Sequence, residues 1–476
     1  MLNAKRVLKA GLFASLPPEW PEPLMPAIRA AVAASRQTVV VLDDDPTGTQ
    51  AIDHVAALTQ WSVESLVAEF KREEPCFFML TNSRSLGPDE AQTLNQQIAS
   101  TLLLASEAAE RRFVVISRSD STLRGHFPLE TESLSQVLGP FDGVLLVPFF
   151  ETGARHTIND IHYLAEGEWL VPAAETQFAR DQTFGYRNSN LRAWIEEKSG
   201  GRVSAQEVSS ISLDTIRCGG PRRVRDELRN LTNGRVCIAN LVSARDLEVF
   251  VLGVLQAEAA GKRFIYRTAA SFPAARAGIT PRPVLTAGEL DLPAAGGGLV
   301  VVGSYIPSSS AQLRELIETG STDNVDVNVR ALWENTSRAA EITRASKELD
   351  AALRSGHDAV LYTSREVITA PDPFASLAIC RQVSDGIVAI LERITARPAF
   401  VIAKGGITSS DILTKALRVH RAEVLGQLLP GIPLWRLGEE CRWPTIHYLT
   451  FPGNLGGPAA LKDAFQKLKA AQARSR

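Results

Sequence analysis

Short apolar runs recur along the chain at the length expected of buried strands. They are Thr38 to Leu42, Phe77 to Leu80, Phe113 to Ile116 and Val144 to Val147. Apolar runs of roughly four to eight residues bounded by turn residues are typical of strands buried on both faces. A stretch of helical character, Pro88 to Arg112, has acidic residues in its first turn and basic residues at its end, which suits the helix dipole. Strands that alternate with helices predict a mostly parallel sheet covered on both faces.

The same alternation restarts in the second half of the chain. Strands are predicted at Leu299 to Val302, Ala359 to Tyr362, Phe400 to Ala403 and Ile446 to Leu449, and helices at Gln312 to Glu318, Phe374 to Thr395 and Ser410 to Leu417. Between the halves, Pro273 to Gly298 is rich in Pro, Gly and Ala, as linkers are. The pattern predicts an α/β protein with two α/β/α domains, mostly parallel sheets and an active site in the cleft between them. We place an N-terminal extension at 1–36, a first domain at 37–280, a linker at 281–298 and a second domain at 299–476.

The composition is that of an ordinary globular protein, with 45% hydrophobic and 22% charged residues and a net charge of −2. No long basic run marks a nucleic-acid-binding surface, and no apolar run approaches the ~18 residues that span a bilayer. The apolar patch from Gly11 to Leu16 is too short for a secretory signal. The five scattered cysteines have no CxxC spacing and predict neither disulfides nor a zinc site. We therefore expect a cytoplasmic protein that binds neither nucleic acid nor membrane.

Three consecutive carboxylates follow the first predicted strand. Asp43, Asp44 and Asp45 stand between the Thr38 run and Pro46-Thr47-Gly48. Ligands of open α/β sheets bind just beyond the carboxyl ends of strands. Adjacent like charges repel one another unless a cation, a substrate hydroxyl or a phosphoryl group uses them. The alternative is a turn and helix cap, since Asp and Thr form both, but three aspartates in a row favour a site.

Two more polar loops follow strands of the first half. Arg118 to His126 contains two arginines, an aspartate and several hydroxyls, and Pro148 to Thr157 adds Arg155. Arginine grips a carboxylate or phosphate through two parallel hydrogen bonds, and Asp and Ser can hold sugar hydroxyls. The alternative for both loops is a solvated surface. His126 and His156 could contact a substrate or be ordinary loop histidines.

The second half carries glycine-rich turns after its strands. They are Val302-Gly303-Ser304, Lys404 to Asp411, and Phe451 to Gly457. Backbone N–H groups at such turns attract phosphate. One Gly-Gly turn is usually a helix cap, but three favour a nucleotide. There is no GxxxxGK[ST] of a Walker type and no strand-led GxGxxG of a dehydrogenase.

An acidic, hydroxyl-binding domain combined with a glycine-rich, phosphate-binding domain indicates phosphoryl transfer to a small polyol. In that chemistry an Asp accepts the proton of the substrate hydroxyl, while a metal ion and backbone donors neutralise the moving charge. The arginines of the first domain would imply that the substrate is acidic.

Five short motifs resemble those of the four-carbon acid sugar kinase family. Asp44 to Gly48 resembles its DDxTG, and Asp120 to Gly125 matches its DSTLRG in full. Gly153 to Thr157 is similar to its GRxT loop with Ala154 inserted. Gly405 to Thr408 and Gly453 to Gly456 are similar to its GGxT and GNxG. The motifs occur in the family's order, and the resemblance spans about residues 38 to 465.

The resemblance implies an ATP-dependent kinase that phosphorylates a hydroxyl of a small acid sugar, of the tetronate or 3-oxo-tetronate type. It implies a sugar-acid-binding N-terminal domain and a nucleotide-binding C-terminal domain, and we expect Mg²⁺ to accompany the ATP. The catalytic candidates are Asp45, Asp44 and Asp120. The candidates for substrate binding are Thr47, Gly48, Arg118, Ser121, Arg124 and Arg155. The candidates for nucleotide binding are Ser304, Gly405, Gly406, Thr408 and Gly453. We assign no metal ligands, and the chain is compatible with a homodimer.

The chain departs from the family pattern at Arg118, His126, Ile407 and Phe451-Pro452, which leaves the substrate open. A branched acid sugar such as 3-oxo-isoapionate is the alternative substrate. From another class, Asp43 and Asp45 fit the DxDxT nucleophile of haloacid-dehalogenase-like phosphatases, but the paired acids of that fold are missing. A third interpretation is a non-catalytic, two-lobed binding protein. Because Asp43 lies outside the DDxTG motif, we expect it to be structural.

Overall fold

The computed structural model describes residues 5–45, 48–49, 51–280, 282–365, 368, 373–453 and 455–475. The chain divides into two compact units. Unit 1 comprises Met1–Ile52 and Trp61–Pro281, and unit 2 comprises Asp53–Gln60 and Arg282–Arg476. Residues 53–60 fall within the predicted range 37–280, but they belong to unit 2, where β3 (Val55–Leu58) pairs with β17 (Arg421–Leu429).

The main sheet of unit 1 has the strand order β10-β11-β6-β12-β5-β2-β4, and each of these pairings is parallel. Its strands are β2 (Gln37–Asp43), β4 (Cys76–Leu80), β5 (Arg112–Arg118), β6 (Gly143–Val147), β10 (Ser209–Ile211), β11 (Arg235–Ala239) and β12 (Phe264–Thr268). Val39, Val40 and Val41 of β2 are fully buried, as expected of a strand covered on both faces.

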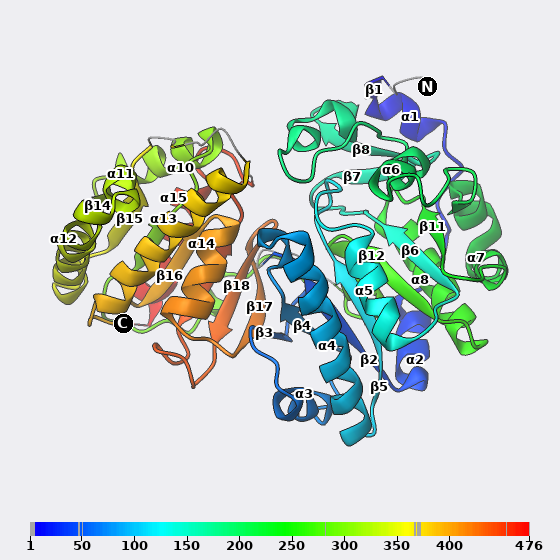
Figure 1. Ribbon diagram of the computed structural model, residues 1–476, viewed down its shortest axis with the longest axis horizontal. Helices are drawn as coiled ribbons and strands as arrows, with labels where there is room; N and C mark the ends of the chain where they lie inside the picture. The colour runs from blue at the N-terminus through cyan, green and yellow to red at the C-terminus, as the bar shows by residue number, and fades with distance from the viewer. Residues whose placement is uncertain are drawn as a thin grey trace. The chain divides into compact units, whose positions relative to one another are not determined.

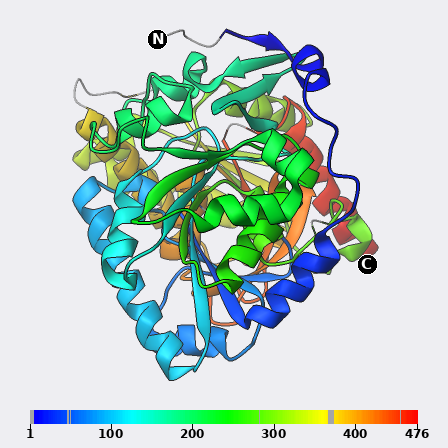
Figure 2. The same cartoon turned by 90° about the vertical axis from the view of Figure 1, so that its right-hand side faces the viewer.

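Two groups of helices cover the sheet of unit 1 (Figures 1 and 2). One group consists of α3 (Val63–Phe70), α4 (Pro88–Ala108) and α5 (Leu129–Leu138). The other consists of α2 (Met25–Ser35), α7 (Gly220–Arg229), α8 (Ala244–Ala259) and α9 (Ser271–Arg276). The predicted strands are confirmed, with shifted ends: β5 runs on to Arg118, so this arginine ends the strand rather than beginning the loop.

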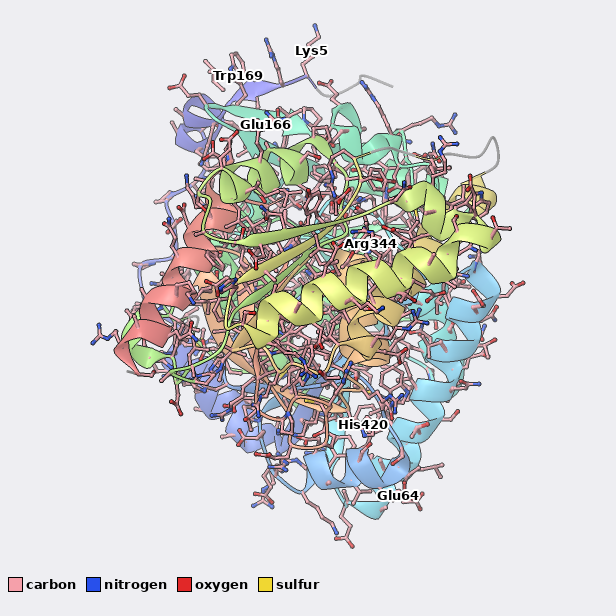
Figure 3. The ribbon with its side chains drawn as sticks, turned by 90° about the vertical axis from the view of Figure 1, so that its left-hand side faces the viewer. Lys5, Glu64, Glu166, Trp169, Arg344 and His420 are labelled. Carbon is pink, nitrogen blue, oxygen red and sulfur yellow. The ribbon has the colours of Figure 1, made fainter. Side chains whose placement is uncertain are left out.

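A small antiparallel sheet in unit 1 has the order β1-β9-β8-β7. Its strands are β1 (Val7–Leu8), β7 (Arg155–Ile158), β8 (Ile161–Glu166) and β9 (Trp169–Pro172). The N-terminal extension supplies the edge strand, and the Arg6 guanidinium lies 4.7 Å from the centre of the Trp169 ring. Figure 3 shows Trp169 and Glu166 at the turn between β8 and β9. The sequence pattern did not predict this sheet.

The sheet of unit 2 has the order β3-β17-β18-β19-β16-β13-β15-β14. Its pairings are parallel from β19 to β14 and antiparallel from β3 to β19. The other strands are β13 (Leu299–Val302), β14 (Asp323–Val327), β15 (Ala359–Thr363), β16 (Phe400–Lys404), β18 (Ile432–Leu437) and β19 (His447–Phe451). The fold is therefore mixed α/β with mostly parallel sheets, as predicted.

Helices also form two groups in unit 2 (Figure 1). They are α10 (Pro307–Ile317) with α15 (Ala460–Arg474), and α12 (Asn335–Arg354), α13 (Pro373–Arg393) and α14 (Gly406–Asp411). On α12, Arg344 forms ion pairs of 2.7 Å with both Glu341 and Glu348, one helical turn to either side (Figure 3). In the described ranges, no helix has the length and apolar character needed to span a bilayer.

Candidate active site

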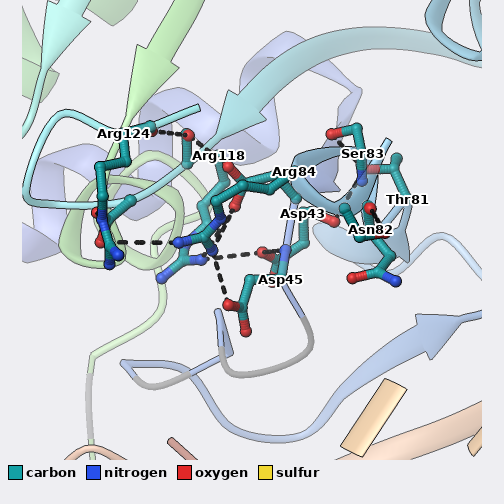
Figure 4. A network of polar contacts seen from close by, with 12 residues as sticks. Asp43, Asp45, Thr81, Asn82, Ser83, Arg84, Arg118 and Arg124 are labelled. Carbon is teal, nitrogen blue, oxygen red and sulfur yellow. Dashed lines mark hydrogen bonds and ion pairs between the residues drawn. The ribbon is translucent and has the colours of Figure 1, made fainter. Parts of the chain in front are cut away.

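Three loops of unit 1 meet at the carboxyl ends of adjacent strands (Figure 4). Strand β2 lies between β4 and β5, and the chain leaves β2 toward β4 but leaves β5 toward β6, on the opposite side. Such a switch point is where open α/β sheets bind their ligands. Asp43 ends β2, Arg118 ends β5, and Arg84 lies in η1 (Ser83–Ser85), the short helix after β4.

Arg84 joins the acidic residues of two loops. Its Nη2 donates to Asp44 Oδ1 at 3.1 Å and to Asp45 Oδ2 at 2.7 Å, and its Nη1 lies 4.0 Å from Asp120 Oδ1. The side chain of Asp45 is 21% exposed and that of Asp44 only 2%. The sequence analysis missed Arg84, although Thr81 to Ser85 is a polar run directly after an apolar strand, the same signal that marked the other loops.

Asp43 anchors the start of the acidic loop. Arg118 Nη1 donates to its Oδ1 at 3.0 Å, and the backbone N–H of Asp45 donates to the same oxygen at 3.3 Å. Burial raises the pKa of Asp43 to about 7, although the charge of Arg118 opposes this. A Cβ at Gly48 would lie 1.9 Å from Asp43 Oδ2, so the loop needs glycine there. Asp43 is thus enclosed by its own loop.

Asp44 and Asp120 lie in different electrostatic environments. Asp44 accepts a hydrogen bond from Ser119 Oγ, and burial raises its pKa while the charge of Arg84 opposes the shift. Burial also acts to raise the pKa of Asp120, but the charges of Arg124 and Arg84 outweigh it and hold this pKa below its usual range. Arg124 Nε donates to Asp120 Oδ2 at 2.7 Å. Asp120 is therefore a fixed anion.

Arg155 on β7 is a further cation of unit 1. It is half-buried, its Nε is buried without a hydrogen-bond partner, and it forms no ion pair among the described residues. Burial lowers its pKa; the charge of Asp120 opposes this shift and that of Arg124 adds to it. These charges lie within electrostatic reach, so Arg155 belongs to the same polar region. A guanidinium in this state is suited to bind an external carboxylate.

A buried histidine supports the DSTLRG loop. His162 Nε2 donates to the carbonyl of Ser121 at 2.8 Å, and its Nδ1 accepts from Thr157 Oγ1 at 3.0 Å. Burial lowers the pKa of His162 to about 4, which keeps the ring neutral and suits this pattern. Ser121 itself is buried. Arg124 also lies 3.5 Å from Asp181 and 5.1 Å from the Phe178 ring centre.

Two histidines of these loops are structural, one candidate residue is not described by the structure, and one buried ion pair was not predicted. His126 and His156 are both buried and hydrogen-bonded to backbone carbonyls, so they act as ordinary structural histidines. Thr47 lies outside the described residues. The sequence analysis missed the pair formed by Arg267 Nη1 and Glu130 Oε2 at 2.5 Å. A Cβ at Gly125 would lie 2.7 Å from Arg267 Nη2, so this pair underlies the loop.

In unit 2, the glycine turns after β13, β16 and β19 come together, because these strands are neighbours in the sheet. The N–H of Gly405 donates to Phe451 O at 2.9 Å. A Cβ at Gly303 would lie 2.1 Å from Thr408 Oγ1, and one at Gly453 would lie 3.1 Å from Ser304 Oγ. Gly406 is the first residue of α14. The five candidate residues of this domain therefore share one region.

A cation, Arg365, lies beside this region. Arg365, after β15, donates through Nη1 to the carbonyl of Ser304 at 2.8 Å and forms no ion pair among the described residues. The sequence analysis did not predict Arg365. Closely packed glycine turns at strand ends, with a positive charge beside them, suit the phosphate groups of a nucleotide. Within the described ranges, no three His, Cys, Asp or Glu residues group as metal ligands.

Both halves of the chain match known domain models. Residues 39–276 match a sugar-binding N-terminal domain, and residues 299–461 match a nucleotide-binding C-terminal domain. The chain belongs to the four-carbon acid sugar kinase family. It is a phosphotransferase that acts on an alcohol group, and its nucleotide-binding domain implies the use of ATP. Family membership excludes the phosphatase alternative built on Asp43 and Asp45.

Individual relatives agree with this placement. The D-erythronate kinase of Heliobacterium modesticaldum (strain ATCC 51547 / Ice1) is 25% identical over 379 residues, which cover 75% of this chain and 79% of that protein. A Salmonella typhimurium LT2 protein, provisionally called a tRNA synthase, has the same fold, with a TM-score of 0.65 and 16% identity over 90% of this chain and 98% of that chain. Haemophilus influenzae protein HI1011 has a TM-score of 0.59 and 18% identity over 90% and 100%.

Proposed function

We propose that this acid sugar kinase transfers the terminal phosphoryl group of Mg·ATP to a hydroxyl of a tetronate or 3-oxo-tetronate. The observation that carries the proposal is the guanidinium of Arg155, which forms no ion pair among the described residues and lies within electrostatic reach of Asp120. An acid sugar needs a cation for its carboxylate and a carboxylate for its hydroxyl, and unit 1 offers both. The D-erythronate kinase activity of a relative supports the tetronate class.

Arg155 is the proposed partner of the substrate carboxylate, because Arg118 and Arg124 are already paired with Asp43 and Asp120. Arg118, Arg124, Ser121, Thr47 and Gly48 would shape the rest of the sugar site. The carboxylates hold the guanidiniums of Arg118 and Arg124 in fixed positions. Arg155, which has no ion pair among the described residues, can reorient toward a ligand.

Asp45 is the proposed general base. It is the more exposed of the two motif aspartates, and Arg84 fixes its carboxylate. In phosphoryl transfer an aspartate at this place accepts the proton of the attacking hydroxyl, which becomes a better nucleophile as the new P–O bond forms. Asp44 and Asp120 would then hold the substrate hydroxyls and keep Arg84 in position.

In unit 2, Ser304, Gly405, Gly406, Thr408 and Gly453 are the proposed nucleotide contacts. Mg²⁺ commonly binds through the nucleotide phosphates with only one or two carboxylates, which agrees with the absence of a ligand cluster among the described residues. When bound, it would neutralise the charge that moves during transfer. The predicted domain ranges, the active site between the domains, the cytoplasmic location and the homodimer stay predictions.

A panel of acid sugars tests the proposal and its alternative substrate. D-erythronate, threonate, 3-oxo-tetronates and 3-oxo-isoapionate would each be incubated with ATP and Mg²⁺, and ADP release and the mass of the product would be measured. The proposal expects the highest kcat/KM with a four-carbon acid. A clear preference for 3-oxo-isoapionate would replace the tetronate class with the branched acid sugar, and the departures from the family pattern, Arg118 and His126 of the sugar-binding domain among them, are the reason to include it.

A further inference from the structure

Lys404, the last residue of β16, is completely buried. Its Nζ donates to the carbonyls of Pro452 at 2.8 Å and Gly453 at 3.3 Å, and it lies 4.1 Å from the centre of the Phe451 ring. In the sheet, Lys404 is the direct neighbour of Phe451 on β19. Lysine is almost never fully buried unless a charge partner accompanies it.

The structure shows no such partner for Lys404 among the residues that it describes. It forms no ion pair with the part of the chain that the structure describes, and burial lowers its pKa to about 7. Two carbonyls and a ring face satisfy its hydrogen bonds in part, but they leave the positive charge uncompensated. Keeping an unpaired ion away from water costs several kcal/mol. A lysine that only connected two turns would therefore destabilise the fold without a compensating gain.

The contacts of Lys404 place its charge beside the glycine turns. The carbonyl of Gly453 accepts from Lys404 and also from Ser309 Oγ at 3.0 Å, and Ser309 Oγ donates to Ser304 Oγ at 2.9 Å. Gly405 follows Lys404 directly in the chain. The ammonium group therefore contacts the turn after β19, while Lys404 itself leads into the turn after β16, so the side chain ties these two turns together.

We infer that Lys404 is a positioning residue that supplies the buried counter-charge for the phosphate groups of the nucleotide. The inference rests on the proposed function, since it takes the glycine turns as the nucleotide site. Lys404 would act through the turns that it holds and through its electric field, without exchanging its carbonyl contacts for the phosphates. Its contribution should therefore grow with the negative charge of the nucleotide.

Calorimetric titration of the full chain tests this inference. The ligands are ATP, AMP and adenosine, and the proteins are wild type, Lys404→Met, Lys404→Gln and the control Lys462→Met. Lys462 is a surface lysine of α15 paired with Glu315 at 2.9 Å. Loss of a buried charge partner should raise the Kd of ATP at least roughly tenfold in both Lys404 variants. The Kd of AMP should rise less, that of adenosine should stay unchanged, and the control should match wild type.

Two results would overturn the inference. One is a Lys404→Gln protein that binds ATP as wild type does, since Gln keeps a hydrogen-bond donor without the charge. The other is an equal loss of affinity for ATP and adenosine, which would indicate a structural tie alone. Lys404→Gln keeps the comparison available if Lys404→Met does not fold. If the wild-type protein binds ATP but releases no ADP with any acid sugar, the proposed substrate class is wrong. The contrast between ATP and adenosine affinities still decides the role of Lys404.

Discussion

Arg84 reaches Asp45 from a neighbouring loop, with its Nη2 2.7 Å from Asp45 Oδ2. Because the same guanidinium also binds Asp44, Arg84→Gln removes a cation that two adjacent carboxylates share, while Arg118 stays 3.8 Å from Asp44. Removing one partner of a buried ion pair costs about 3 to 5 kcal/mol, and we expect a loss near the lower end because Arg84 is 17% exposed. Denaturant unfolding measures this. Arg72→Gln, at an exposed arginine paired with Glu69, is the matched control and should change little.

Asp45→Asn should lower turnover by roughly 10²- to 10⁴-fold, the usual contribution of a general base. The Kd of ATP should stay unchanged, because the nucleotide contacts are proposed to come from unit 2. Steady-state kinetics with the best acid sugar, together with ATP titration, separate the two effects. Near-normal turnover would remove Asp45 from the role of base, and Asp44 would be the next residue to substitute.

Arg155→Gln should raise the KM for the acid sugar by roughly 10- to 100-fold, since a charge-assisted hydrogen bond contributes about 1.5–3 kcal/mol. The KM for ATP should not change. Arg155→Lys should recover only part of the affinity, because an ammonium group cannot form the two parallel bonds of a guanidinium. Arg187→Gln, at an arginine side chain that is 90% exposed, provides the control. An unchanged KM for the acid would place the carboxylate at another arginine.

Asp43 should make the protein less stable as the pH rises. Burial raises its folded pKa to about 7, above the value of an unfolded Asp, so the folded state binds the proton more tightly. The free energy of unfolding that depends on Asp43 is therefore highest near pH 4 and falls as the pH rises to about 7. Asp43→Asn removes this slope. Between pH 5 and pH 7.5 the variant should gain roughly 2 kcal/mol relative to wild type, measured by urea unfolding, whereas parallel pH profiles would contradict the assignment.

Gly405→Ala should weaken ATP binding more than an alanine at another glycine with a positive φ does. Gly405 has φ of +115°, and a Cβ there would lie 3.2 Å from Ser304 Cβ, within the proposed phosphate cradle. Gly320 also has a positive φ, but a Cβ there meets nothing within 4 Å. Comparing ATP affinity in the two alanine variants separates loss of the cradle from backbone strain. Equal affinities in both would move the nucleotide away from Gly405.

The sequence revealed the site where one strand leads directly into one polar run. Asp44, Asp45, Asp120 and Arg124 were predicted in this way, because strand ends and motif letters are local signals, and the structure places them close together. Arg84 and Arg267 were missed, since each is a single arginine whose partner lies far away in the sequence. Asp45 follows β2 and Glu130 lies on α5, so only the fold brings each pair together. The antiparallel strands β7 to β9 and the β17–β18 hairpin were missed as well. These strands are short or contain half-exposed residues, so the apolar runs that mark a buried parallel strand are weak there.

The central claim is that a carboxylate on the substrate is recognised by Arg155 while a neighbouring hydroxyl is phosphorylated. The most direct measurement compares ADP release by the wild-type chain with ATP, Mg²⁺ and either D-erythronate or erythritol, its neutral polyol counterpart. We predict ADP release with the acid and only background with the polyol, and the Arg155→Gln variant should reduce this difference. No ADP above background with any acid sugar, or equal release with erythritol, would contradict the account.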